Sequence, residues 1–136
     1  MEQLSFSQAD QRAELQRPLV LAVDDSTDDL VLITQALALF GYAFITATDG
    51  PTALQLIQTY QPELILLDIV LRGMSGIEIV RELKQQPQTR KIPVIAVTVL
   101  ARPEDRTQIL AAGCNDYINK PYRLEDLEMM LQRYLS

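Results

Sequence analysis

Five polar residues follow short apolar segments of the chain: Asp24, Asp25, Asp68, Thr98 and Lys120. If those segments are strands of one sheet, the three carboxylates meet at one edge and repel each other, which costs stability unless a cation compensates. A hard divalent cation, Mg²⁺ or Mn²⁺, is the simplest compensation, because Mg²⁺ prefers carboxylate oxygens and keeps positions open for water or phosphate oxygens. Lys120 would neutralise part of the cluster and could later hold a phosphoryl oxygen.

The chemistry that fits this set is attack of the Asp68 carboxylate on phosphorus, which gives an aspartyl phosphate. Phosphoryl transfer needs mainly positioning and charge neutralisation, and a metal ion with a lysine supplies both, while Thr98 adds a hydroxyl donor. No general base is required, because a carboxylate is ionised at neutral pH. The absence of histidine from the chain is therefore compatible with this mechanism.

Each of these residues also has an ordinary structural explanation. Asp24, Asp25 and Ser26 could cap the following helix. Asp68 could be a residue of the turn after a strand, Thr98 an ordinary β-branched strand residue and Lys120 a solvated charge. The combination favours the functional interpretation, because these polar positions lie at the ends of four different strands of one predicted sheet.

The elements that would position these residues alternate along the chain. Apolar segments predict strands at Leu19–Val23, Ala43–Ala47, Leu64–Leu67, Val94–Val97 and around Tyr117–Ile118. Helical spacing predicts helices from about Asp28 to Phe40, from Gly50, from Gly76 to before Pro87, from Pro103 to Gly113, and over Leu124–Leu135. Five strand–helix units predict an α/β sandwich with a parallel sheet, whose ligands bind beyond the carboxyl ends of the strands.

Composition excludes several other classes of protein. The net charge is −6 and the 12 basic residues are scattered, so we expect no direct DNA binding. We expect no membrane association and a cytoplasmic location, since no apolar run approaches a membrane span and no signal peptide is evident. The single Cys114 cannot form an internal disulfide. Residues 1–17 are expected to be a flexible extension, with a short helix as the alternative, and residues 18–136 to form the domain.

From Pro18 to Leu135 the chain resembles the receiver domain of two-component response regulators, of the stand-alone, chemotaxis-regulator-like kind. The matching segments are VDDS at 23–26, LILLDIVLRGMSG at 64–76, AVT at 96–98 and GCNDYINKPY at 113–122. The resemblance implies a doubly wound, flavodoxin-like (βα)5 sandwich with strand order 2-1-3-4-5. It also implies a phosphoprotein of signal transduction that catalyses only its own phosphorylation and dephosphorylation and is not a metabolic enzyme.

Carried over by position, the resemblance makes Asp68 the phosphoacceptor. Mg²⁺ would be held by Asp24, Asp25, Asp68 and the backbone carbonyl of Val70. Lys120 would contact the phosphoryl group, and its peptide bond to Pro121 would be cis. Thr98 and Tyr117 would form the switch, Thr98 moving towards the phosphoryl group while Tyr117 turns inward.

The chain departs from the family pattern at four positions. Arg72 replaces a common proline, so the loop after Asp68 is expected to be more mobile. Val99 replaces a small residue and could narrow access to the site or restrict Thr98. Val70 and Leu100 are apolar where the family tunes hydrolysis, so we expect slow phosphate loss, because neither side chain can orient an attacking water.

The expected partners are a sensor histidine kinase or a histidine phosphotransfer protein, docking around Ser26–Leu30, and an unidentified downstream protein. Output is expected at the face of the fourth helix, fifth strand and fifth helix, where a homodimer could also form; candidate surface positions are Arg102, Asp105, Gln108, Tyr117 and Arg123. The alternatives are a pseudo-receiver that only binds proteins or dimerises, and a hydrolase or nucleotide-binding protein. The last is disfavoured, because neither GxxxxGK[ST] nor GxGxxG occurs.

Overall fold

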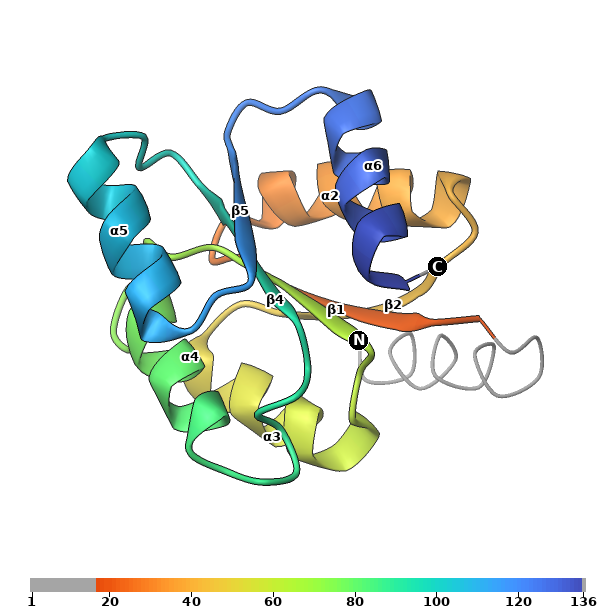
Figure 1. Cartoon of the computed structure of the whole chain (residues 1–136). Coiled ribbons are helices and arrows are strands. Elements are labelled where there is room, and N and C mark those ends of the chain that lie inside the picture. Colours follow the sequence, from red (N-terminus) through yellow and green to blue (C-terminus); the bar gives the residue numbers. More distant parts are fainter. Residues whose placement is uncertain (1–16, 136) are drawn as a thin grey trace.

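Each of the five expected apolar segments forms a strand, and each strand is followed by a helix (Figure 1). The computed structural model describes residues 17–135, so the expectation for the N-terminal extension lies almost entirely outside the described residues. The strands are β1 (Leu19–Val23), β2 (Ala43–Ala47), β3 (Leu64–Leu67), β4 (Val94–Thr98) and β5 (Asp116–Asn119). The helices are α2 (Thr27–Leu39), α3 (Gly50–Tyr60), α4 (Gly76–Lys84), α5 (Pro103–Ala112) and α6 (Leu124–Leu135).

The five strands form one parallel sheet in the order β2-β1-β3-β4-β5. This order confirms the predicted doubly wound, flavodoxin-like α/β fold. The register sets the positions that matter for the site, because Val23 at the end of β1 pairs with Leu67 at the end of β3. The residues that follow these two strands must therefore emerge side by side.

Helices cover both faces of the sheet, with α2 and α6 on one face and α3, α4 and α5 on the other (Figure 1). Successive strand residues point to opposite faces, so each strand contributes to two apolar layers. Leu21 and Leu67 pack on the side of α3, α4 and α5, whereas Ala22 and Leu66 pack on the side of α2 and α6. Burial on both faces explains why the strands read as continuous apolar runs.

The helix ends follow local capping chemistry. The Ser26 side chain accepts from the Asp29 backbone N–H at the start of α2, and Ser75 forms a capping box with Glu78 at the start of α4. Gly41 has φ +89° just after α2, the left-handed conformation that glycine adopts most readily. Gln61, directly after α3, also has a left-handed backbone, with φ 49°, although glutamine is not a residue type that favours this conformation.

Cys114 lies in the core between α5 and β5 and is buried. Burial raises the pKa of its thiol to about 11. The thiol is therefore protonated at neutral pH, in keeping with a packing role rather than a reactive one.

Gly76 brings the start of α4 close to the loop that leaves β3. A Cβ atom built at Gly76 would lie 2.6 Å from the Cα atom of Ile69 and 2.7 Å from the carbonyl oxygen of Asp68. These are backbone atoms, so a larger residue cannot be accommodated by a side-chain movement. The absence of a side chain at position 76 thus lets α4 hold the segment that follows Asp68.

We expect Gly76→Ala to lower the free energy of unfolding by about 2–3 kcal/mol, since overpacking must displace main-chain atoms. Urea denaturation measures the change. Gly41→Ala is a suitable control, because its Cβ would meet nothing within 4 Å and only backbone strain of about 1–2 kcal/mol applies. A Gly76→Ala protein as stable as the wild type would contradict the close approach.

Candidate functional site

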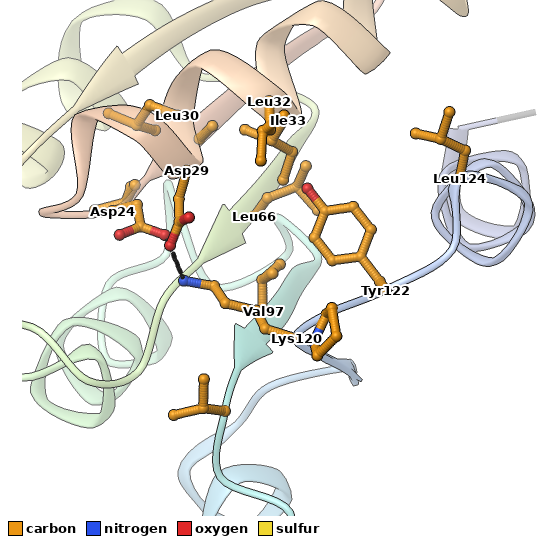
Figure 2. Close-up of a pocket in the computed structure, with 14 residues that line it drawn as sticks. Asp24, Asp29, Leu30, Leu32, Ile33, Leu66, Val97, Lys120, Tyr122 and Leu124 are labelled. Carbon is orange, nitrogen blue, oxygen red and sulfur yellow. Dashed lines mark hydrogen bonds and ion pairs between the residues drawn. The ribbon is translucent and has the colours of Figure 1, made fainter.

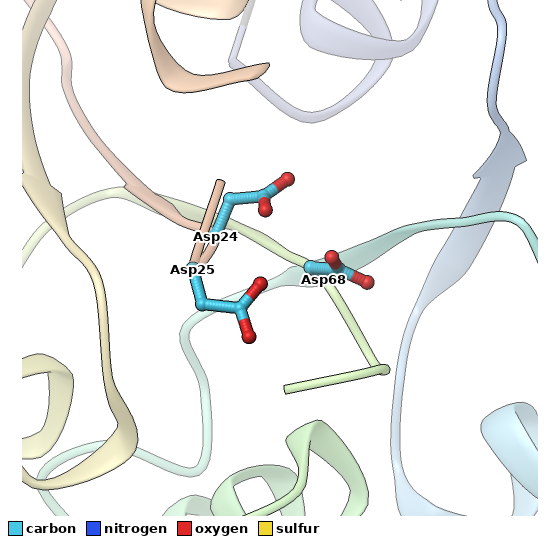
Figure 3. Close-up of side chains that lie close together, drawn as sticks. All are labelled: Asp24, Asp25 and Asp68. Carbon is cyan, nitrogen blue, oxygen red and sulfur yellow. The ribbon is translucent and has the colours of Figure 1, made fainter. Parts of the chain in front are cut away.

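Three aspartates that follow β1 and β3 converge at the carboxyl edge of the sheet (Figure 3). Asp24 and Asp25 come directly after β1, and Asp68 comes directly after β3. One carboxylate oxygen from each lies within 4.8 Å of the others. The side chains of Asp24 and Asp68 are each 9% exposed, whereas that of Asp25 is 25% exposed. The expected juxtaposition of these three groups is present.

Lys120 reaches the same edge from the segment after β5. Its Nζ atom lies 2.6 Å from Oδ2 of Asp24 and 3.2 Å from Oδ2 of Asp68. Its backbone N–H donates to the Thr98 carbonyl oxygen at 2.9 Å, which fixes the start of the chain segment that carries it. The peptide bond from Lys120 to Pro121 is cis, as expected.

The electrostatics of the cluster show the opposing effects of burial and pairing. Burial raises the pKa of Asp68 and the Asp24 charge adds to that rise, although the Val70 backbone N–H and Lys120 act in the opposite direction. Burial alone would lower the pKa of Lys120, but hydrogen bonds to Asp24 and to Asp29 outweigh it, and the pKa is raised. Lys120 is therefore held as a cation beside carboxylates whose negative charge it offsets only in part.

Backbone groups orient each carboxylate. Oδ1 of Asp24 accepts from the Ser26 N–H at 2.9 Å, and Oδ1 of Asp68 accepts from the Val70 N–H at 3.0 Å. The helix cap of α2 is provided by Ser26 rather than by an aspartate. The alternative in which Asp24 and Asp25 serve only as caps of this helix is therefore wrong for both residues.

Asp25 is oriented by the loop that follows β3. Its Oδ2 accepts from the backbone N–H of Arg72 at 3.2 Å and lies 3.4 Å from the Nε atom of the same residue. A proline at position 72 has no N–H to donate, so this backbone contact depends on the departure from the family pattern. The expected mobility of the loop stays a prediction.

Thr98 ends β4 and is fully buried. Its hydroxyl oxygen accepts from the Leu100 N–H at 3.1 Å. Tyr117 lies on β5 and is half-buried. The guanidinium carbon of Arg106 lies over its ring, 4.8 Å from the ring centroid. Thr98 thus lies at the carboxyl end of β4, as expected, and Tyr117 lies on β5, the edge strand of the sheet. Their roles as a switch stay predictions.

The donor set suits a hard divalent cation. Three carboxylates at one edge offer hard oxygen ligands, and the exposed part of Asp25 leaves one side open to solvent. The excess of three carboxylates over one lysine amine also favours a cation electrostatically. The residues present therefore fit Mg²⁺ or Mn²⁺.

A pocket of about 540 Å³ opens beside the site, between the start of α2 on one side and Val97, Val99 and residues 120–124 on the other (Figure 2). Its walls include Leu32, Val99, Tyr122 and Leu124, and Lys120 lies at its edge. Leu32 is 62% and Val99 63% exposed. Val99 thus lines an open pocket, and its effect on access or on Thr98 stays a prediction.

The expected output face consists of α5, β5 and α6. Arg102, Gln108 and Arg123 are exposed there, as predicted. Asp105 was expected at this surface, and that expectation is wrong, because the residue is buried. Its carboxylate folds back and accepts from the backbone N–H of Arg102 at 3.2 Å, which satisfies the start of its own helix.

One group at the site was missed by the sequence reasoning. Asp29, in the first turn of α2, lies 3.0 Å from the Nζ atom of Lys120 through its Oδ2. The DDSTDD segment places a second acidic pair, Asp28 and Asp29, in the first turn of the helix that starts beside the site, and this was the available signal.

Comparison with known proteins identifies the family. The sequence model of one protein family, the response regulator receiver domain, matches residues 20–132. The chain belongs to the response regulator receiver family. No helix within residues 17–135 of this receiver is both long and apolar enough to cross a membrane.

Relatives of the receiver include both short and long proteins. It is 36% identical over 117 residues to the polar-differentiation response regulator DivK of Brucella anthropi, covering 86% of this chain and 95% of that protein. It is also 36% identical over 123 residues to a probable cyclic di-GMP phosphodiesterase of Vibrio cholerae, covering 90% of this chain but only 28% of that protein. The chain thus spans about a quarter of the length of the Vibrio relative.

Among solved structures, the receiver domain of the sensor histidine kinase PA1611 from Pseudomonas aeruginosa is similar, with a TM-score of 0.81 and 32% identity. The match covers 87% of this chain and 97% of that one. The Pseudomonas domain holds a magnesium ion in its active site cleft. Receiver domains are signalling phosphoacceptors that bind Mg²⁺ at an acidic pocket, and this chain has an acidic cluster of Asp24, Asp25 and Asp68.

Proposed function

We propose that this receiver accepts a phosphoryl group from a phosphohistidine onto Asp68 in a Mg²⁺-dependent reaction and signals by protein contact. The observation that carries the proposal is the meeting of the Asp24, Asp25 and Asp68 carboxylates within 4.8 Å, with Lys120 3.2 Å from Asp68. Positioning and charge neutralisation are what phosphoryl transfer requires, and this arrangement supplies both.

In the proposed step a carboxylate oxygen of Asp68 forms a bond to phosphorus. The bond from phosphorus to the donor's imidazole nitrogen breaks, and its electron pair stays on that nitrogen. The Val70 N–H holds Oδ1 of the carboxylate at 3.0 Å and keeps its plane fixed. Lys120 offers an ammonium group on the Oδ2 side, where it can contact a transferred phosphoryl oxygen as a point charge.

A bound Mg²⁺ would supply Lewis-acid neutralisation of the phosphoryl oxygens. Asp24, Asp25 and Asp68 would hold it, together with the backbone carbonyl of Val70. The protein atoms account for only part of the coordination, as is usual for Mg²⁺, which keeps several waters.

The proposed output couples this site to the face of α5, β5 and α6. Thr98 would move towards the phosphoryl group and lose the hydrogen bond that its hydroxyl oxygen accepts from the Leu100 N–H. Tyr117 would turn inward and leave its contact with Arg106. A downstream protein or a second copy of the chain would bind the altered face. The phosphodonor would dock on α2 around Ser26–Leu30, where exposed Val31 and Leu32 add apolar contact area.

Phosphorylation by acetyl phosphate tests acceptor and metal together. With MgCl₂ the wild type should gain the mass of one phosphoryl group, and EDTA should slow the gain on the order of a hundredfold, since a metal ion contributes several kcal/mol to such a transition state. Asp68→Asn should gain none, because an amide is not a nucleophile for phosphorus. Intact-protein mass spectrometry measures all three.

The matched control is Asp126→Asn, which alters an exposed aspartate of α6 and should leave the rate unchanged. A wild type that gains no phosphate would favour the pseudo-receiver, a protein-binding module with the same fold. Phosphate retained on Asp68→Asn would place the acceptor elsewhere.

The lifetime of the aspartyl phosphate should depend on Val70 and Leu100. Val70 is 50% exposed and Leu100 is partly buried, and neither can orient an attacking water. Introducing Val70→Asn with Leu100→Glu should shorten the lifetime by on the order of tenfold, through a water held by the new polar groups. Decay of the phosphorylated mass after removal of acetyl phosphate gives the rate.

The size-matched control is Val70→Leu with Leu100→Met, which adds no polar group and should keep the slow decay. An unchanged or longer lifetime in the polar double variant would refute this account of phosphate loss.

A further inference from the structure

The ammonium group of Lys120 is shared among three carboxylates, and one of them is not part of the strand-end cluster. Its Nζ atom lies 2.6 Å from Asp24, 3.2 Å from Asp68 and 3.0 Å from Asp29. Asp24 and Asp68 belong to the proposed metal site, whereas Asp29 belongs to the first turn of α2. Figure 2 shows the Lys120 amine facing the carboxylates of Asp24 and Asp29.

The backbone fixes Asp29 in this place. Its N–H donates to the Ser26 side-chain oxygen at 3.2 Å, so the cap of α2 also sets the position of this residue. The Asp29 side chain is 43% exposed, against 9% for Asp24 and for Asp68. Asp29 therefore holds the lysine from the solvent side of the buried pair.

The sharing has an electrostatic consequence for a cation bound at the cluster. A lysine ammonium has three N–H donors and one unit of positive charge. If it rested on Asp24 and Asp68 alone, it would neutralise the same oxygens that a metal ion needs and would repel the ion. A third carboxylate, that of Asp29, takes up one of the three N–H donors and offsets part of the ammonium charge.

We propose that Asp29 is a positioning residue for Lys120, which shares the ammonium with Asp24 and Asp68, leaves less of its charge to oppose a cation, and so strengthens Mg²⁺ binding. This inference rests on the proposed function, because it concerns the same metal site. Asp29 is not among the proposed metal ligands and does not take part in the proposed phosphoryl transfer. It acts through the lysine.

A neighbouring residue separates this role from a general charge effect. Asp28 lies in the same first turn of α2, is exposed, and carries the same charge near the same helix terminus. Within residues 17–135 the ion pairs of Lys120 are with Asp24, Asp29 and Asp68, and Asp28 is not among them. Asp28→Asn is thus a matched control for Asp29→Asn.

Titration with MgCl₂, followed by the backbone amide signals of Val70 and Arg72 in NMR spectra, tests the inference without any phosphorylation. These two amides donate to Asp68 and Asp25, so they report on the site directly. Asp29→Asn should raise the Mg²⁺ dissociation constant about twofold to fivefold above that of Asp28→Asn, the range for a half-exposed ion pair. In a Lys120→Met background this difference should disappear.

The outcomes are separable, and the same spectra verify that each variant is folded. Equal effects of Asp28→Asn and Asp29→Asn, or an Asp29→Asn effect that persists with Lys120→Met, would overturn the role of Asp29 and leave the proposed function standing. A wild type whose Val70 and Arg72 signals do not respond to MgCl₂ would overturn the metal site and this inference together.

Discussion

Repulsion among three carboxylates at one sheet edge is the constraint on which the rest of this structure depends. Asp24, Asp25 and Asp68 place oxygens within 4.8 Å of one another, and two of these side chains are largely withdrawn from water. Like charges at such distances oppose folding, and burial makes each charge more costly. Lys120 offsets part of this cost, but its single charge is shared with Asp29 as well. A site of this kind is therefore already arranged to attract a cation.

Burial of the apolar sheet and helices stabilises the fold and offsets the cost of bringing these carboxylates together. Strands β1, β3 and β4 are buried along their whole length, with helices against both faces. Parallel pairing then delivers the residues after β1 and β3 to one edge, and the backbone amides of the following turns orient the carboxylates. The reactive side chains lie in the loops that follow the strands, and the buried sheet fixes the positions of those loops. The rigid sheet therefore holds the charged groups in a defined arrangement.

The sequence was sufficient to predict the sheet, its helices and the meeting of the strand-end residues, because buried parallel strands read as apolar runs and their ends are marked by polar residues. It was not sufficient for contacts that depend on side-chain reach. The pairing of Lys120 with Asp29 joins residues 91 positions apart. The folding back of Asp105 onto Arg102 and the left-handed Gln61 are local choices among several that the same residues allow. The spacing of apolar residues indicates which face of a helix or strand a residue occupies. It does not indicate which group the end of a long side chain contacts.

A crystal structure of the protein grown with MnCl₂, with anomalous scattering used to locate the ion, tests the central claim most directly. The account predicts one Mn²⁺ at the edge where β1 and β3 end, bound by carboxylate oxygens of the three aspartates at about 2.1 Å, with Lys120 outside its coordination sphere. An ordered ion elsewhere with none at this edge would contradict it.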